Sequence, residues 1–122
     1  MELKNKVVLI TGSSDGIGKA TAILLSKEKA KIVITYNKNK EKGEKVFNEC
    51  SENSECLLVH LNVLDGESIK KCIEACIEKF GKIDVLINNA GVLLRKNFLE
   101  QGESEIDLLL DTNLKSLIKV TK

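Results

Sequence analysis

The chain has 122 residues, of which 43% are apolar, 30% are charged and 3% are aromatic. This length corresponds to one domain or a piece of one, and the composition excludes both a low-hydrophobicity disordered segment and a membrane protein. With 19 basic and 18 acidic side chains the net charge is +1, so neither nucleic acid nor an anionic membrane surface is expected as a partner.

Short aliphatic runs alternate along the chain with amphipathic stretches, a pattern typical of strand–helix–strand units. The first run, residues 6–11, is too short for a helix and is followed by glycines, so we expect a buried parallel strand. The helix expected next, from residue 16 to about residue 28, has apolar residues at helical spacing: Ile17, Ala20, Ile23 and Leu24. A second strand is expected at Lys31–Tyr36, and a second helix opens in the polar stretch 37–44.

A third strand is expected at residues 55–61. Asp65 then begins the clearest helical pattern as a plausible N-cap, and Gly81 ends it. A fourth strand is expected at residues 84–88, and Ser104 is expected to cap a last helix. These elements predict an α/β fold of the Rossmann-like, doubly wound type, with a parallel sheet in the order 3-2-1-4 and helices on both faces. Ligands of such sheets bind beyond the carboxyl ends of the strands.

Three glycines follow the first strand in the segment Thr11-Gly12-Ser-Ser-Asp15-Gly16-Ile17-Gly18. Glycine lets the backbone turn tightly and approach a pyrophosphate, and the start of the following helix supplies free N–H groups and partial positive charge. The spacing TGxxxGxG differs from the GxGxxG fingerprint and from the phosphate-binding loop that ends in Lys-Ser/Thr. Taken alone, the segment leaves open a glycine-rich turn without a ligand.

A second motif, Asn88-Asn89-Ala90-Gly91, follows the fourth strand, where the expected strand order brings it beside the glycine loop. Together with TGxxxGIG and the segment Asp111-Thr-Asn113-Leu, it resembles the short-chain dehydrogenase/reductase family, and the resemblance covers the whole chain. It implies that residues 1–122 form an NAD(P)-binding Rossmann-type domain, cut before the catalytic half of the family fold. Within the family the layout is most similar to the 3-oxoacyl-carrier-protein reductase branch.

The resemblance also implies roles for individual residues. Asn88 matches an asparagine that steadies the central sheet. Asn113 matches the asparagine that holds a water in the proton relay to the catalytic lysine, although so short a match leaves open an exposed polar residue on a helix. The residues implied to bind the cofactor are Gly12, Ser14, Gly16, Ile17, Gly18, Tyr36, Asn37, Lys38, Asn62, Val63, Asn89, Ala90 and Gly91.

Charge indicates which nicotinamide cofactor is preferred. An acid at the end of the second strand hydrogen-bonds the ribose hydroxyls of NAD(H), and this chain has Tyr36 at that position. Asn37, Lys38 and Lys40 follow and offer donors and positive charge, which suit a 2′-phosphate, although the lysines also fit a solvated surface run. We therefore expect NADP(H) to be preferred, with NAD(H) possible.

Two positions depart from the family pattern. Asn62 replaces the family aspartate that accepts a hydrogen bond from the adenine amino group. Its amide oxygen can still accept that bond, so we expect weaker adenine recognition. Asp15 places an acid inside the phosphate loop, where it would repel a pyrophosphate unless it turns to solvent.

The family's catalytic serine, tyrosine and lysine have no counterpart here. Tyr36, the only tyrosine, is followed by Lys40 at the family spacing but falls at the adenosine end of the expected groove. We therefore expect this chain alone to be inactive, as the nucleotide-binding part of an enzyme that transfers hydride between NADP(H) and a carbonyl or alcohol. The alternatives are a non-catalytic cofactor-binding or assembly module and a non-functional truncation product.

Further expectations concern partners and setting. Residues 85–87 would form a bare apolar edge of the sheet, so we expect a homo-oligomer through this strand or the last helix. Cys72 and Cys76 together with His60 suggest a zinc site, but their apolar helix stripe favours core packing, and no metal is expected. Since apolar runs stop at four residues and no export signal is evident, we expect a cytoplasmic protein.

Overall fold

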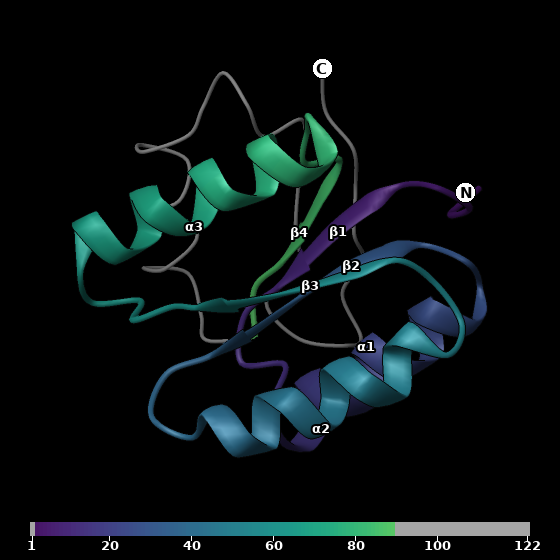
Figure 1. Ribbon diagram of the computed structural model, residues 1–122, viewed down its shortest axis with the longest axis horizontal. Helices are drawn as coiled ribbons and strands as arrows, with labels where there is room; N and C mark the ends of the chain where they lie inside the picture. Colours follow the sequence, from purple (N-terminus) through teal and green to yellow (C-terminus); the bar gives the residue numbers. More distant parts are fainter. Residues whose placement is uncertain (1, 90–122) are drawn as a thin grey trace.

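Parallel β-strands and α-helices alternate in the computed structural model, which describes residues 2–89 (Figure 1). In chain order the elements are β1 (Val7–Ile10), α1 (Gly16–Lys27), β2 (Lys31–Tyr36), α2 (Lys40–Ser51), β3 (Cys56–His60), α3 (Gly66–Phe80) and β4 (Val85–Ile87). The strands and helices predicted for this part of the chain are confirmed, with small differences at their ends. The helix expected after Ser104 lies outside the described residues.

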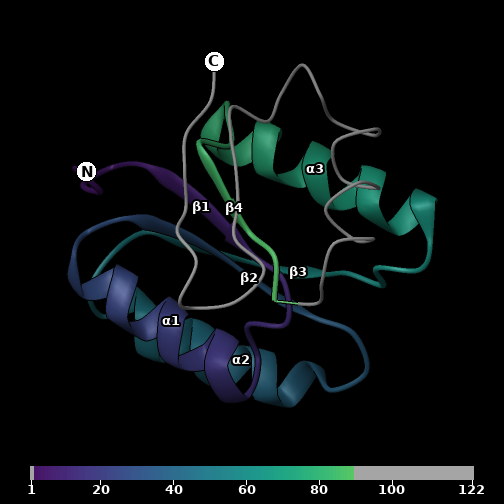
Figure 2. The same cartoon turned by 180° about the vertical axis from the view of Figure 1, so that it is seen from behind.

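The sheet has the predicted strand order β3-β2-β1-β4, and every pair is parallel. Ile10, at the carboxyl end of the central strand β1, is in register with Ile34 of β2 and Ile87 of β4. Figures 1 and 2 show α1 and α2 on one face of the sheet and α3 on the other. Because the strand order reverses at β1, the carboxyl ends of β1, β2 and β4 meet around a single switch point.

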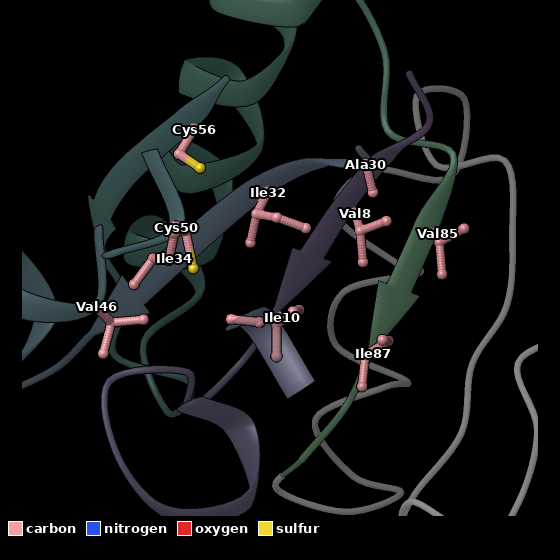
Figure 3. Close-up of a cluster of buried hydrophobic side chains, with 11 residues drawn as sticks. Val8, Ile10, Ala30, Ile32, Ile34, Val46, Cys50, Cys56, Val85 and Ile87 are labelled. Carbon is pink, nitrogen blue, oxygen red and sulfur yellow. The ribbon is translucent and has the colours of Figure 1, made fainter. Parts of the chain in front are cut away.

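Alternate side chains of β1 belong to two apolar cores, one on each face of the sheet. Val7 and Leu9 pack in the core under α3, whereas Val8 and Ile10 pack in the core under α1 and α2. Figure 3 shows the second core, with β1 side chains between those of β2 and β4. Burial on both faces explains the uninterrupted aliphatic run, since each fully buried side chain of this kind contributes about 1.5–3 kcal/mol.

The helix α3 follows the sequence prediction closely. The Asp65 carboxylate accepts a hydrogen bond from the Glu67 N–H at 3.0 Å, and Gly81 ends the helix in a left-handed conformation with a φ of 80°. Cys72 and Cys76 are fully buried in the core under α3, as their place in the apolar stripe predicts. Within residues 2–89, no helix has the length and apolar character needed to cross a membrane.

The face of α1 that packs against the rest of the protein is not the face that carries Ile17 and Leu24. Ile17 and Leu24 are 56% and 61% exposed. The buried positions are instead occupied by small residues: Gly18, Thr21, Ala22 and Ser26. Small side chains let the helix lie close to the sheet and the glycine loop. The spacing of apolar residues therefore predicted the helix correctly but not the face that it buries.

The strand β4 lies at an edge of the described sheet, but its side chains are not bare. Val85, Leu86 and Ile87 are 1%, 1% and 6% exposed. Leu86 joins the core under α3, and the other two join the core under α1 and α2. The predicted edge position of this apolar strand is confirmed within the described residues, where β4 pairs only with β1, while helices on the two faces cover its side chains.

A buried carboxylate ties the start of β4 to the start of β1. Asp84 Oδ2 accepts a hydrogen bond from the Val7 N–H at 2.8 Å and lies 3.0 Å from Lys82 Nζ. In Asp84→Ala the buried Val7 N–H loses its acceptor, so we expect urea denaturation to show a free energy of unfolding lower by about 1.5 kcal/mol. Lys82→Ala removes only the exposed partner and should cost about 0–1 kcal/mol. Equal losses in the two variants would contradict this account.

Candidate functional site

The loop between β1 and α1 turns at Gly12, whose φ of 66° lies in the left-handed region. Asp15 then caps α1, since its Oδ1 atom accepts a hydrogen bond from the Gly16 N–H at 2.8 Å. Gly18, in the first turn of the helix, lies against the Gly12 backbone where a side chain would not fit. The loop therefore lets an anion approach the N–H groups at the start of α1 without obstruction by side chains at these glycines.

Two buried hydroxyl groups fix this loop to the end of β2. Ser13 Oγ donates to the Ile10 carbonyl oxygen at 2.8 Å and accepts from the Thr35 N–H at 2.8 Å. Thr35 Oγ1 donates to the same carbonyl oxygen at 2.9 Å and accepts from the Gly12 N–H at 3.1 Å. Because both side chains are buried and fully engaged, the network holds the backbone of the glycine loop in one position.

The segment after β4 lies directly beside the glycine loop. The Thr11 N–H donates to the Ile87 carbonyl oxygen at 3.1 Å, and Thr11 Oγ1 accepts from the Asn89 N–H at 2.9 Å. Asn88 is buried, and a Cβ atom at Gly12 would lie 3.3 Å from the Asn89 side-chain nitrogen. The two sequence motifs therefore meet, as predicted, as far as Asn89. Three other predicted residues lie outside the described part of the chain: Ala90, Gly91 and Asn113.

A pocket of about 410 Å³ opens beside the glycine loop, a volume within the range of small-molecule sites. Its lining includes six of the residues predicted to bind a cofactor: Gly12, Ser14, Tyr36, Asn37, Lys38 and Val63. Five further residues also line it: Asp15, Thr35, Asn39, Lys42 and Leu61. Two ammonium groups and one carboxylate are thus gathered in a single pocket at the carboxyl end of the sheet.

The contribution of α2 to this pocket was missed by the sequence analysis. Asn39 Oδ1 accepts a hydrogen bond from the Lys42 N–H at 3.0 Å and so caps the helix, a role that its position before a helical pattern could have revealed. Lys42 Nζ reaches Asp15 Oδ2 at 2.9 Å, and no sequence pattern signals this contact between residues 27 positions apart.

The acid inside the glycine loop is therefore paired. The hydrogen bond and charge of Lys42, together with the Gly16 N–H, hold the pKa of the Asp15 carboxyl below its usual range. The sequence analysis expected Asp15 to repel a pyrophosphate unless it turned to solvent; its side chain is 71% exposed, but it also lines the pocket. An anion in the pocket would meet this carboxylate with its charge partly balanced.

Asn62 shapes the turn that follows β3. Its Oδ1 atom accepts a hydrogen bond from the Leu64 N–H at 3.0 Å, and its own N–H donates to Ser68 Oγ at 2.8 Å. An amide oxygen has two lone pairs, so the contact to an adenine amino group expected from the sequence is compatible with this turn. The neighbours Leu61 and Val63 supply an apolar wall of the pocket.

Tyr36 forms another wall, at the end of β2. Its ring packs edge-on against His60, with 5.5 Å between the ring centroids. The ring gives the pocket a flat apolar surface beside the polar Asn37 and Lys38. Within residues 2–89, no group of three or more His, Cys, Asp and Glu side chains is placed to hold a metal ion.

Sequence comparison relates the chain to known proteins. The profile described as short chain dehydrogenase matches residues 6–122. A 3-oxoacyl-[acyl-carrier-protein] reductase of Staphylococcus epidermidis is 36% identical over 114 residues, which cover 93% of this chain and 47% of the relative. The chain spans about half the length of the curated relatives that it matches.

Two solved structures with bound dinucleotide have the same fold over the matched part. An NADH-dependent reductase complexed with NAD is 34% identical with a TM-score of 0.67, over 75% of this chain and 38% of that one. A Burkholderia cenocepacia protein with bound NADP, described as a dehydrogenase, is 26% identical with a TM-score of 0.68, over 71% of this chain and 34% of that one. The two neighbours differ in whether the bound dinucleotide has a 2′-phosphate.

Proposed function

This chain belongs to the short-chain dehydrogenase family, and we propose that it is the nucleotide-binding part of an oxidoreductase that transfers hydride between NADP(H) and a carbonyl or alcohol. The observation that carries the proposal is the pocket lined by the glycine loop and the end of β2, with Asn89 hydrogen-bonded to Thr11 beside that loop. We propose that residues 1–122 act as one dinucleotide-binding domain, incomplete with respect to the family fold.

The residues of the pocket fit the parts of a dinucleotide. Gly12 and Gly18 leave the start of α1 open to a pyrophosphate, whose negative charge suits the Ile17 N–H, whereas the Gly16 N–H donates to Asp15 and would bind a phosphate only if that bond opened. Val63 supports an apolar contact to adenine, and Asn89 is placed beside the loop where a ribose would lie. When bound, the nicotinamide supplies the hydride chemistry. The residues described here bind and orient the nucleotide.

The proposal includes a preference of the pocket for NADP(H) over NAD(H). The end of β2 carries Tyr36 where an acid would favour the ribose hydroxyls of NAD(H), and Asn37 and Lys38 beside it line the pocket. An ammonium group and an amide can bind a 2′-phosphate through charge-assisted hydrogen bonds. NAD(H) remains a substrate of lower affinity in this proposal.

The 122 residues are proposed to bind a nucleotide without transferring hydride themselves. Tyr36, the only tyrosine, lies beside His60 in the wall of the pocket, where the proposal places the adenosine end of the dinucleotide. Asn113 is proposed to position a water in the proton relay of the whole enzyme. The similarity to a 3-oxoacyl-[acyl-carrier-protein] reductase supports a carbonyl substrate of that kind for the whole enzyme.

Two further parts of the proposal concern assembly and setting. We propose a homo-oligomer that assembles through the last helix or the β4 edge, and a cytoplasmic location. The four cysteines at positions 50, 56, 72 and 76 are free and buried in the structure, which supports a reducing compartment.

Calorimetric titration of the chain with NADPH and NADH tests the cofactor proposal. We expect a dissociation constant about tenfold lower for NADPH, and in Lys38→Met a loss of most of this difference, because the 2′-phosphate loses a cationic partner. Lys45→Met, in the exposed middle of α2 and outside the pocket lining, is the matched control and should change neither constant. Tighter binding of NADH by the unmodified chain would overturn the preference, and binding of neither nucleotide would overturn the proposed function.

A further inference from the structure

An ion pair joins the two sides of the pocket, one belonging to the glycine loop and the other to α2. Asp15 uses both carboxylate oxygens: Oδ1 accepts the Gly16 N–H at 2.8 Å, and Oδ2 accepts from Lys42 Nζ at 2.9 Å. The backbone of Lys42 is fixed in turn, because its N–H donates to Asn39 Oδ1 at 3.0 Å. The two charges are therefore held at defined positions in the pocket lining.

The stability of the fold does not require this pair. The side chains of Asp15 and Lys42 are 71% and 52% exposed, and ion pairs between exposed side chains contribute little to folding. The same two side chains are nevertheless the charged members of the pocket lining other than Lys38. An anion in the pocket would therefore meet both charges.

Building on the proposed function, we propose that the Asp15–Lys42 pair limits the affinity of the pocket for a 2′-phosphate. Asp15 repels the phosphate and at the same time engages the ammonium group of Lys42. A phosphate monoester carries about −1.5 to −2 charges at neutral pH, so it competes with the carboxylate for that ammonium group. Tight binding of the phosphorylated dinucleotide then requires Lys42 to turn from Asp15 to the phosphate.

Removal of the carboxylate charge should therefore strengthen phosphate binding. Asp15→Asn keeps an oxygen that can cap α1, so the helix start is preserved while the negative charge is lost. We expect 2′,5′-ADP to bind this variant about fivefold to tenfold more tightly than the unmodified chain, with 5′-AMP changed less than about twofold. In Lys42→Met the phosphate loses this ammonium group as a partner, and 2′,5′-ADP binding should weaken by a similar factor.

The double variant, Asp15→Asn with Lys42→Met, tests whether the two side chains affect 2′,5′-ADP binding through each other or independently. If Asp15 acts chiefly by engaging Lys42, Asp15→Asn should strengthen 2′,5′-ADP binding much less in the Lys42→Met background, where no ammonium group remains to be released. Additive effects of the two substitutions, or an equal gain for 5′-AMP, would overturn the proposal. Glu41→Gln and Lys45→Met remove the same charges from exposed α2 positions outside the pocket lining and should leave both probes unchanged.

A measurement without nucleotide distinguishes failure of this inference from failure of the proposed function. Carboxyl NMR titration should find the pKa of Asp15 below its usual range and raised in Lys42→Met, with Lys19 as the remaining nearby cation. An unchanged pKa in Lys42→Met would overturn the ion pair itself. If the titration behaves as expected and neither probe binds any variant, the proposed function fails and this inference falls with it.

Discussion

Gly18→Ala is expected to lower the free energy of unfolding by about 3 kcal/mol or more and to abolish measurable NADPH binding. A Cβ atom at this position would lie 2.7 Å from the Gly12 carbonyl carbon and 3.0 Å from Ser13 Cα. Both are backbone atoms, so the clash cannot be relieved by a rotamer change. Either α1 or the glycine loop must move, and either movement displaces the N–H groups that are proposed to face the pyrophosphate.

Gly16→Ala is the matched control for this prediction. Gly16 is the first residue of α1 and has a φ of 55°, but a Cβ atom there would have no neighbour within 4 Å. The variant should therefore show only the cost of a left-handed residue, about 1–2 kcal/mol. Urea denaturation and NADPH titration of both variants measure the difference. If the two variants prove equally stable, close packing of α1 against the loop is not the reason for glycine at position 18.

Thr35→Val is expected to lower the free energy of unfolding by about 2–3 kcal/mol and NADPH affinity by about tenfold. The side chains are nearly the same size, but valine has no hydroxyl group. The Gly12 N–H loses the acceptor that it has at 3.1 Å, and the Ile10 carbonyl oxygen loses one of its two side-chain donors. A loosened Gly12 backbone no longer holds in place the loop that is proposed to face the phosphates.

Thr21→Val provides the comparison. Thr21 is also buried, but its hydroxyl group donates only within α1, to the Ile17 carbonyl oxygen at 2.8 Å. Such local bonds contribute little to helix stability, so we expect a loss below about 0.5 kcal/mol and unchanged NADPH affinity. Thermal denaturation and calorimetry measure both quantities. Equal effects of the two substitutions would show that the network around Thr35 does not position the loop.

The strands and helices of residues 2–89 could be predicted because their signals are local. A buried run such as Val7–Ile10 cannot be an amphipathic helix, and Asp65 and Gly81 mark the two ends of α3 in the sequence itself. The inner face of α1 could not be predicted in the same way. Its buried positions are small residues, and what selects them is the closeness of the sheet rather than their hydrophobicity.

The sequence predicts which segments of the candidate site lie close together, because strand order decides that. It does not predict which side chains in those segments make contact. Parallel strands in the order β3-β2-β1-β4 bring Gly12, Tyr36 and Asn89 to the same end of the sheet whatever their exact pairing. Contacts such as Ser13 to Thr35 and Asp15 to Lys42 depend on how far each element extends, and the residues are 22 and 27 positions apart. No spacing rule connects such pairs.

The hydrogen bond from Asn89 to Thr11 has a consequence for biogenesis. It joins residues 78 positions apart, whereas β1, β2 and β3 are consecutive in the chain. During synthesis the glycine-rich turn that begins at Thr11 is therefore made long before Asn89, which donates a hydrogen bond to Thr11. In a nascent chain this hydrogen bond can therefore form only after synthesis has passed β4 and the fourth strand has docked.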